Sequence, residues 1–447
     1  MKSIKIIYSL FLLLFLPFIS TNINAQPNVG EIQHFTGNEN TIPPNLIQEY
    51  TSAKQRHDND AKGRLGREIM KYLPMQEQEI SAPEDNPIQI TPQPPFTPDW
   101  YPTDVLVHSG LVASAGGFRQ IDLKQGEDGW MYLTVNQRPE GAFTIYKSSN
   151  GGGTWAGVIG ISYGLVRYIQ SITMLVENRS NTNIGDSTKI IVYYVTSTNT
   201  NFNDGRLEVF SVNRNGLNFK NRLVSTPAAG NKYEFPSSCS DGQYWGTATY
   251  LPCVVREATN AGTQVGLRHF LSMDWDSTHS NALLVTSLDD YYPSIQYGEK
   301  NPGTDSIYIA TERRVTATSY GLRLIATSEF VSVNHYVYYV ASASGVKYEK
   351  PELTVVQQHT SLPRKMLITC TRDRNPRYCY STNGSATWTT DLLMGTSSSV
   401  VADYTTCNSD SSTNSGQYVI MGFATDDGDS VNVKQLTIPP GAIYNLL

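Results

Sequence analysis

The chain of 447 residues has few charged residues, few cysteines and few long apolar runs. Charged residues make up 17% of it, and a formal net charge of −6 without a basic cluster argues against nucleic acid or an anionic membrane as partner. The five cysteines form no Cys-x-x-Cys pair and the seven histidines no His-x-x-x-His pair, so no metal site is predicted. No glycine-rich loop leads into a helix in the sequence, and we predict no cofactor.

The first 25 residues have the pattern of a secretory signal peptide. Lys2 and Lys5 precede an apolar run from Ile6 to Ile19, and Ala25 is a small residue at a cleavage position before Gln26. The run is too short for a membrane span, and no later segment approaches a spanning length. We therefore expect a secreted protein, extracellular or at the cell surface, that begins at Gln26.

Export permits disulfides, although an odd number of cysteines leaves at least one thiol without a partner in the chain. A hairpin that turns at Arg374-Asn375 would place Cys370 opposite Cys379, and we predict a disulfide between them. The expected strand pairing keeps Cys239 and Cys253 from facing each other, so no bridge is expected there.

Residues 26–100 differ in character from the rest of the chain. Good helix formers between Pro44 and Leu73 predict an exposed or loosely docked helix. The prolines between Pro83 and Pro102 predict a stiff, extended linker. We expect this N-terminal segment to lead into a single β-domain over residues 101–447.

From Tyr101 onward, strand and turn patterns alternate with a period of roughly 50 to 65 residues, as in propellers and solenoids. Three repeats share a proline mark at the start of a strand: Glu234-Phe235-Pro236-Ser237, Tyr291-Tyr292-Pro293-Ser294 and Glu349-Lys350-Pro351-Glu352. The units fall near 118–164, 165–226, 233–288, 291–346, 349–396 and 397–438. The last one lacks a strand, which Val105 to Ser114 would supply by pairing with Val431 to Ile438, closing the ring. The predicted fold class is all-β, a six-bladed β-propeller with a short helical and Pro-rich N-terminal arm.

One motif occurs twice after a short strand pattern, first as Ser148-Ser149-Asn150-Gly151-Gly152-Gly153-Thr154-Trp155 and again as Ser381-Thr382-Asn383-Gly384-Ser385-Ala386-Thr387-Trp388. Asn-Gly is a hairpin-turn signal, because both residues tolerate positive φ. The motif resembles the Asp-box of the sialidase-like, or BNR-repeat, β-propellers. The resemblance implies that it closes the turn between the third and fourth strands of a blade. It also implies a structural role, in which Asn bonds to turn amides and Trp packs between strands.

The resemblance extends poorly to catalytic residues. A sialidase needs three arginines for a carboxylate, a Tyr-Glu nucleophile pair and an Asp acid/base. Phe118-Arg119-Gln120-Ile121 stands where the family has its first arginine motif but lacks the proline. Sialidase activity is therefore not expected. Other glycosidases need only two carboxylates at a set separation, and the residues chosen here as ligand-binding candidates near blade entrances are Arg119, Asp122, Glu234, Asp290, Tyr291 and Glu349.

The function predicted first is a secreted, non-catalytic binding or structural propeller with a glycan or an extracellular protein as partner. The first alternative is a glycoside hydrolase or related carbohydrate-active enzyme that uses acids at the mouth of the ring. The second is a subunit of an extracellular homo-oligomer assembled through the N-terminal arm. An Asp-Ser-(Thr/Ile/Val) motif resembles the O-glycosylation motif of secreted Bacteroidota proteins, which makes candidates of Ser187, Ser277, Ser306 and Ser430.

Overall fold

A computed structural model of the chain describes residues 33–34, 43–56, 61, 64–65, 68, 79–81, 99–100, 105–109 and most of 121–437. The gaps between 121 and 437 are 127–129, 138–140, 151, 164–165, 179–187, 240–251, 272–278, 286–288, 302–303, 329–335, 357–364, 382–387, 395–401, 410–418 and 426–429. Within these described parts, no helix has both the length and the apolar character that crossing a membrane requires.

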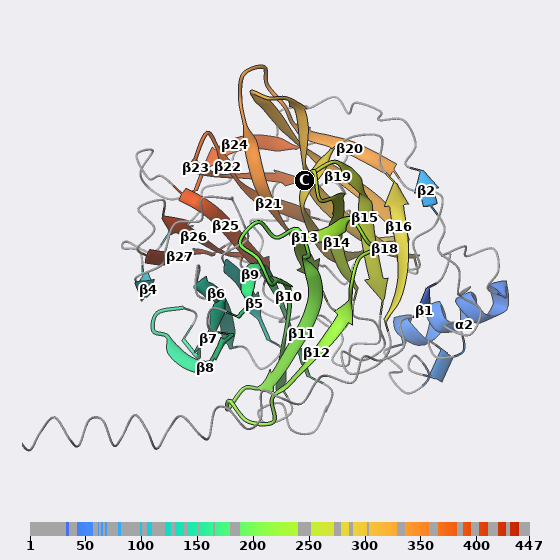
Figure 1. Ribbon diagram of the computed structural model, residues 1–447, viewed down its shortest axis with the longest axis horizontal. Helices are drawn as coiled ribbons and strands as arrows, with labels where there is room; N and C mark the ends of the chain where they lie inside the picture. The colour runs from blue at the N-terminus through green and yellow to red at the C-terminus, as the bar shows by residue number, and fades with distance from the viewer. Residues whose placement is uncertain are drawn as a thin grey trace, which may run out of the picture.

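The described residues form five blades, each with four antiparallel strands that follow one another in sequence around a common axis (Figure 1). Blade I contains β5 (Ile121–Gln125), β6 (Met131–Gln137), β7 (Ala142–Ser148) and β8 (Ala156–Ser162), and blade II contains β9 (Tyr168–Asn178), β10 (Thr188–Ser197), β11 (Arg206–Asn213) and β12 (Lys220–Ser225). Blade III contains β13 (Asn231–Ser238), β14 (Cys253–Thr259), β15 (Gln264–Leu271) and β16 (Ser280–Val285). Blade IV contains β17 (Asp290–Asn301), β18 (Thr304–Thr316), β19 (Ser319–Ser328) and β20 (Tyr336–Ala341), and blade V contains β21 (Tyr348–Val356), β22 (Lys365–Arg372), β23 (Asn375–Ser381) and β24 (Thr389–Leu393).

A composite sheet, built from both ends of the domain, lies between blades V and I. It consists of β25 (Ala402–Ser409), β26 (Val419–Thr425) and β27 (Ser430–Thr437), with β3 (Asp99–Trp100) and β4 (Val105–Ser109) both paired to β27. The predicted pairing of the segment after Val105 with the last strand is therefore confirmed for Val105–Ser109, where Val105 lies opposite Val433.

The prediction of six blades is wrong. The described residues contain five blades of consecutive strands, whereas the remaining sheet is the composite one. The N-terminal segment also supplies strands, because β1 (Gln33–His34) and β2 (Glu79–Ser81) pair in parallel with β16 at the outer edge of blade III. These strands and the helix α2 (Pro44–Gln55) lie at the periphery beside β16 (Figure 1). Strands of two or three residues carry no readable alternation, which is why the sequence pattern did not reveal them.

The first strand of each sheet contacts the first strand of the next one around the axis. Here a side chain of one sheet accepts a hydrogen bond from a backbone amide of the next, so edge amides that are buried still find a partner. The acceptors are Asp122 for Met174 N (2.6 Å), Thr173 for Ser238 N (3.0 Å), Ser237 for Ile295 N (3.0 Å), Ser294 for Leu353 N (2.8 Å) and Thr406 for Leu123 N (3.1 Å). We call this set the axial hydrogen-bond ring, and it explains the serine that follows the proline in two of the three marks.

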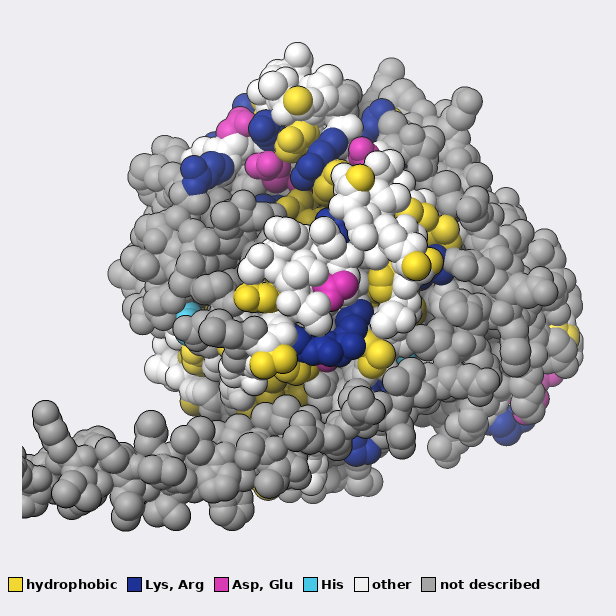
Figure 2. Space-filling view, in the orientation of Figure 1, with side chains coloured by type: hydrophobic (Ala, Val, Ile, Leu, Met, Phe, Trp, Pro, Cys, Tyr) yellow, Lys and Arg dark blue, Asp and Glu magenta, His cyan; other side chains and the backbone are white. Residues whose placement is uncertain are grey.

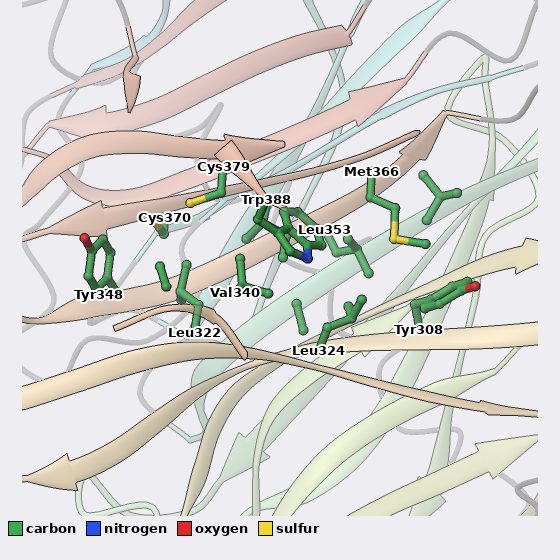
Figure 3. Packing of buried hydrophobic residues seen from close by; sticks show 14 of the residues in the cluster. Tyr308, Leu322, Leu324, Val340, Tyr348, Leu353, Met366, Cys370, Cys379 and Trp388 are labelled. Atoms are coloured by element: carbon green, nitrogen blue, oxygen red, sulfur yellow. The ribbon is translucent and has the colours of Figure 1, made fainter. Parts of the chain in front are cut away.

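The turn after Ser148 joins β7 to β8, the third and fourth strands of blade I, as predicted. Asn150 Oδ1 accepts a hydrogen bond from Thr154 N at 2.9 Å, and Trp155 Nε1 donates to Gly152 O at 3.0 Å. Trp388, directly before β24, is fully buried in the core between blades IV and V (Figure 3). Asn383 lies outside the described residues. Asn150 and Trp388 thus stabilise a turn and a core, the structural role that the resemblance implies.

The register predicted for the disulfide is wrong. The hairpin between β22 and β23 turns at Asp373-Arg374, so Cys370 lies opposite Arg377 and Cys379 opposite Ile368. Both turn residues have positive φ, 47° and 67°, which gives a tight two-residue turn without the Asn-Gly signal. Cys370 and Cys379 are free thiols packed near each other in the core (Figure 3).

We expect all five cysteines to be reduced and unreactive in the native protein. Each one is a buried thiol. A hydrogen bond with Cys379 and burial raise the pKa of the Cys370 thiol, and burial raises the pKa of Cys407 to about 12, which suppresses the reactive thiolate. Titration with a thiol reagent should find none accessible without denaturant and five per chain in it. A lower count in denaturant without reductant would mean that some of the cysteines are joined in a disulfide, which would contradict the prediction.

A buried histidine, His269 on β15, should make the protein sensitive to acid. Both ring nitrogens lack a hydrogen-bond partner among the described residues, and burial lowers the pKa of the ring to about 4. The unfolded chain takes up this proton near its ordinary pKa of 6.5, so this contribution to stability is complete above that pH and is lost as the pH falls through 4. The loss amounts to about 3 kcal/mol at most. Urea unfolding at pH 7 and pH 4.5 should show a smaller decrease for His269→Leu than for the wild type, with His279→Gln as control; equal decreases would contradict it.

Candidate functional site

Strands alternate in direction within each blade, so the start of the first strand, the end of the second and the start of the third meet at one face of the ring. We call it the entrance face. Blades III, IV and V gather ionisable side chains there, at the starts of β13, β17 and β21 and the ends of β14 and β18. Figure 2 shows one face of the ring, on which basic and acidic side chains of the described residues lie next to one another.

The three proline marks form β-bulges that direct residues toward the axis. In each mark the residue before proline has a positive φ: Phe235 at 50°, Tyr292 at 49° and Lys350 at 55°. The strand register shifts at each mark, as expected for bulges. Backbone strain of this kind persists where the surroundings hold it and often lies at functional sites.

The bulged side chains of neighbouring blades meet in one cluster. The rings of Phe235 and Tyr292 are 4.1 Å apart between centroids, and both pack with Tyr404 of the composite sheet. Lys350 Nζ lies 6.0 Å from the centroid of the Tyr404 ring. The three proline marks thus bring two aromatic rings and one amine together beside Tyr404.

A stack of side chains spans blades III and IV at the entrance face. The guanidinium carbons of Arg256 and Arg314 lie 3.9 and 3.4 Å from the centroid of the Tyr291 ring. Two such groups would overlap on one face of the ring, so they occupy opposite faces. Each arginine also pairs with a carboxylate, Arg256 with Glu234 and Arg314 with Glu312, the latter at 2.9 Å. We call Arg256, Tyr291 and Arg314 the arginine–tyrosine stack.

Glu312 is the carboxyl group of this cluster with the most unusual surroundings. It is fully buried, accepts a hydrogen bond from Arg314 Nε at 2.9 Å and another from the backbone amide of Lys350 at 3.2 Å. Burial raises the pKa of Glu312 and the charge of Glu349 raises it further, while Arg314 opposes both. Burial, followed by the charge of Glu312, likewise raises the pKa of Tyr292 well above its ordinary value. A carboxyl group whose pKa is raised and that lies beside a second carboxylate has the surroundings of a general acid.

Glu234, Tyr291 and Glu349, predicted from the sequence, do meet at the entrance face. Asp122 and Asp290 lie apart from this cluster, and both are fully buried in contacts of their own. Asp122 contacts Lys124 at 3.0 Å and caps an amide in the axial hydrogen-bond ring. Asp290 pairs with Arg323 and accepts a hydrogen bond from Thr311 at 2.7 Å.

Other candidates either lie outside the described residues or are placed without a test of their role. Arg119, Ser187 and Ser277 belong to the first group. Ser306 lies in β18 and Ser430 in β27, and nothing in their placement bears on glycosylation. No group of three or more His, Cys, Asp or Glu in the described parts of the chain could hold a metal ion.

Sequence reasoning missed six members of the cluster: Arg256, Tyr292, Glu312, Arg314, Lys350 and Tyr404. A signal for two of them is visible in the sequence, since Glu312-Arg313-Arg314 follows the apolar run Ile307 to Ala310 near the end of β18. The others come from blades that are far apart in sequence, and only the closed ring brings them together.

Comparison with known proteins identifies the fold. No protein-family model matches the chain, and no curated protein matches it. A sialidase of Trypanosoma rangeli has a similar structure, with 12% identity and a TM-score of 0.52 over 78% of this chain and 61% of that one. The GH93 α-L-arabinofuranosidase of Fusarium graminearum, in complex with arabinobiose, matches with 14% identity and a TM-score of 0.52 over 75% and 97%. The α-L-arabinanase of Penicillium chrysogenum, also with arabinobiose, matches with 14% identity and a TM-score of 0.52 over 77% and 100%.

At these identities the likeness concerns the fold alone. The chain spans about 60% of the length of the T. rangeli sialidase chains that it matches. These structures have the sialidase-like propeller fold that the motif after Ser148 indicated by its resemblance. The neighbours named here are glycoside hydrolases, whereas the function predicted first for this chain is non-catalytic.

Proposed function

We propose that the protein is a glycoside hydrolase whose active site lies at the entrance face of blades III to V. The observation that carries the proposal is the buried Glu312 carboxyl group, whose pKa is raised and which lies near the second carboxylate of Glu349. Hydrolysis of a glycosidic bond requires such a pair. The similarity to sialidase and arabinanase structures supports the same assignment at the level of the fold.

In the proposed reaction Glu312 is the general acid. Its proton passes to the glycosidic oxygen as the bond from that oxygen to the anomeric carbon breaks, and the bonding electrons leave with the oxygen. The positive charge that develops on the sugar ring is stabilised by the Glu349 carboxylate. Water supplies the hydroxyl group that ends on the anomeric carbon and the proton that restores Glu312.

The proposal includes the location of the substrate. The pattern of residues 1–25 marks the protein for export, so its substrate would be an extracellular glycan. A sialic acid substrate would need a free cluster of arginines for its carboxylate. Arg256 and Arg314 are instead each paired with a glutamate, which favours a glycan without a carboxylate at this position.

Release of sugar from a panel of aryl glycosides and plant and animal polysaccharides tests the proposal. We expect turnover of at least one neutral glycoside by the wild type, and none by a Glu312→Gln/Glu349→Gln double variant prepared identically. Asp373→Asn, which changes an exposed acid at a turn of the same face, should keep the activity. If no substrate turns over and a glycan still binds with equal affinity to wild type and double variant, the non-catalytic binding function replaces this one.

A further inference from the structure

We propose that Tyr291 is a positioning residue of this site: clamped between two guanidinium groups, its ring holds Arg314 on the Glu312 carboxyl group and so controls the acid–base behaviour of that group. This inference rests on the proposed function for its catalytic meaning, although the contacts themselves do not. Tyr291 is half-buried, and neither of its faces is free to stack on a sugar.

The two sides of the arginine–tyrosine stack differ in rigidity. Arg256 has a side chain that is 1% exposed, and it is fixed by Glu234 and by the carbonyl oxygen of Gly262 at 2.9 Å. Arg314 has a side chain that is 34% exposed, so water competes for its guanidinium group. The ring therefore has a buried arginine on one face and a partly exposed one on the other, and it is the partly exposed one that contacts Glu312.

Few contacts fix Arg314 apart from the Tyr291 ring and the carboxylate. Its guanidinium carbon lies 3.4 Å from the centroid of Tyr291 but 5.1 Å from that of Tyr320 on β19. A cation held over an aromatic face gains from the negative charge of that face, and the gain grows as water is excluded. Loss of the ring would let Arg314 turn into solvent and away from Glu312.

Loss of the contact with Arg314 should change the pKa of Glu312 in one direction only. The charged and titratable groups that face Glu312 are Arg314 on its own strand, Tyr292 on β17 and Glu349 on β21, and the backbone amide of Lys350 on β21 donates to it. Arg314 is the cation that lowers the pKa of Glu312 against burial and Glu349. Without it that pKa rises, and a general acid whose pKa rises keeps its proton to a higher pH.

The experiment compares Tyr291→Leu with Tyr291→Phe, which keeps the ring. In the pH dependence of kcat, the upper limb should move up by about half to one pH unit in Tyr291→Leu and stay in place in Tyr291→Phe. In an Arg314→Met background, the limb should already be displaced and Tyr291→Leu should add nothing, because both changes remove the same interaction. An unchanged limb in Tyr291→Leu, an equal shift in Tyr291→Phe, or an additive shift in the double variant would each overturn the proposal.

Failure of the hydrolase assignment would be recognised separately. If the wild type turns over no glycoside, Glu312 is titrated instead through the difference in unfolding free energy between wild type and Glu312→Gln at a series of pH values. The midpoint of that difference should rise in the Tyr291→Leu background and not in the Tyr291→Phe background. That result would support the positioning role without catalysis, whereas equal midpoints would refute it.

Discussion

Replacing Glu312 with Gln should lower kcat/KM on a glycoside with a poor leaving group by about 10²–10⁴-fold. The amide has nearly the same shape and still accepts a hydrogen bond from Arg314, but it has no proton to give to the departing oxygen. An activated leaving group such as dinitrophenolate departs without protonation, so the loss there should be much smaller. The upper limb of the pH profile should also disappear, because the group that titrates there is gone.

Glu349→Gln is the matched comparison for this prediction. Since its carboxylate is proposed to stabilise the positive charge on the sugar, its loss should slow good and poor leaving groups alike. Asp373→Asn should leave both rates unchanged. Equal losses on the two leaving groups for Glu312→Gln would show that Glu312 is no acid, and retention of full activity would remove it from the mechanism.

A chain that begins at Ala115, without β3 and β4, should fail to form the native ring. Residues of β27 would lose the antiparallel partners that Val105–Ser109 and Trp100 supply, and the composite sheet would be left with a long open edge. Circular dichroism should show no cooperative thermal transition, and light scattering should show aggregation.

A chain that begins at Asp99 provides the control, because it keeps β3 and β4 and lacks only α2, β1 and β2. The strands that it loses from blade III contain two and three residues, so it should melt cooperatively at a moderately lower temperature. If both truncated chains melted like the intact protein, the composite sheet would not be what holds the ring closed.

Strand periodicity and turn chemistry were sufficient to predict an all-β propeller with closure by Val105–Ser109, because these features are local or repeat at a fixed spacing. The two-residue turn at Asp373-Arg374 was not predictable, since Asp tolerates positive φ but Arg rarely adopts it. That shift of register moved Cys379 from the position opposite Cys370 to the position opposite Ile368.

The candidate site was only partly predictable for a different reason. An acid near a strand end looks the same in the sequence whether it is paired with a buried arginine, as Asp290 is with Arg323, or lies between an arginine and a second carboxylate, as Glu312 does. The partner of each acid lies on another strand or another blade. The pairing of strands and the packing of blades therefore have to be known before the role of an acid can be assigned.

The pairing of β27 with β4 has a consequence for how the protein folds during its synthesis. The residues that pair, such as Val431 and His108, are separated by more than three-quarters of the domain, so each blade can form as it is synthesised while the ring stays open. Contacts this distant in sequence slow the final step of folding. During that interval the unpaired edge of β25–β27 is exposed to proteases and to other chains. In an exported protein this final pairing, between the last strand to emerge and one of the first, would take place outside the cell's interior.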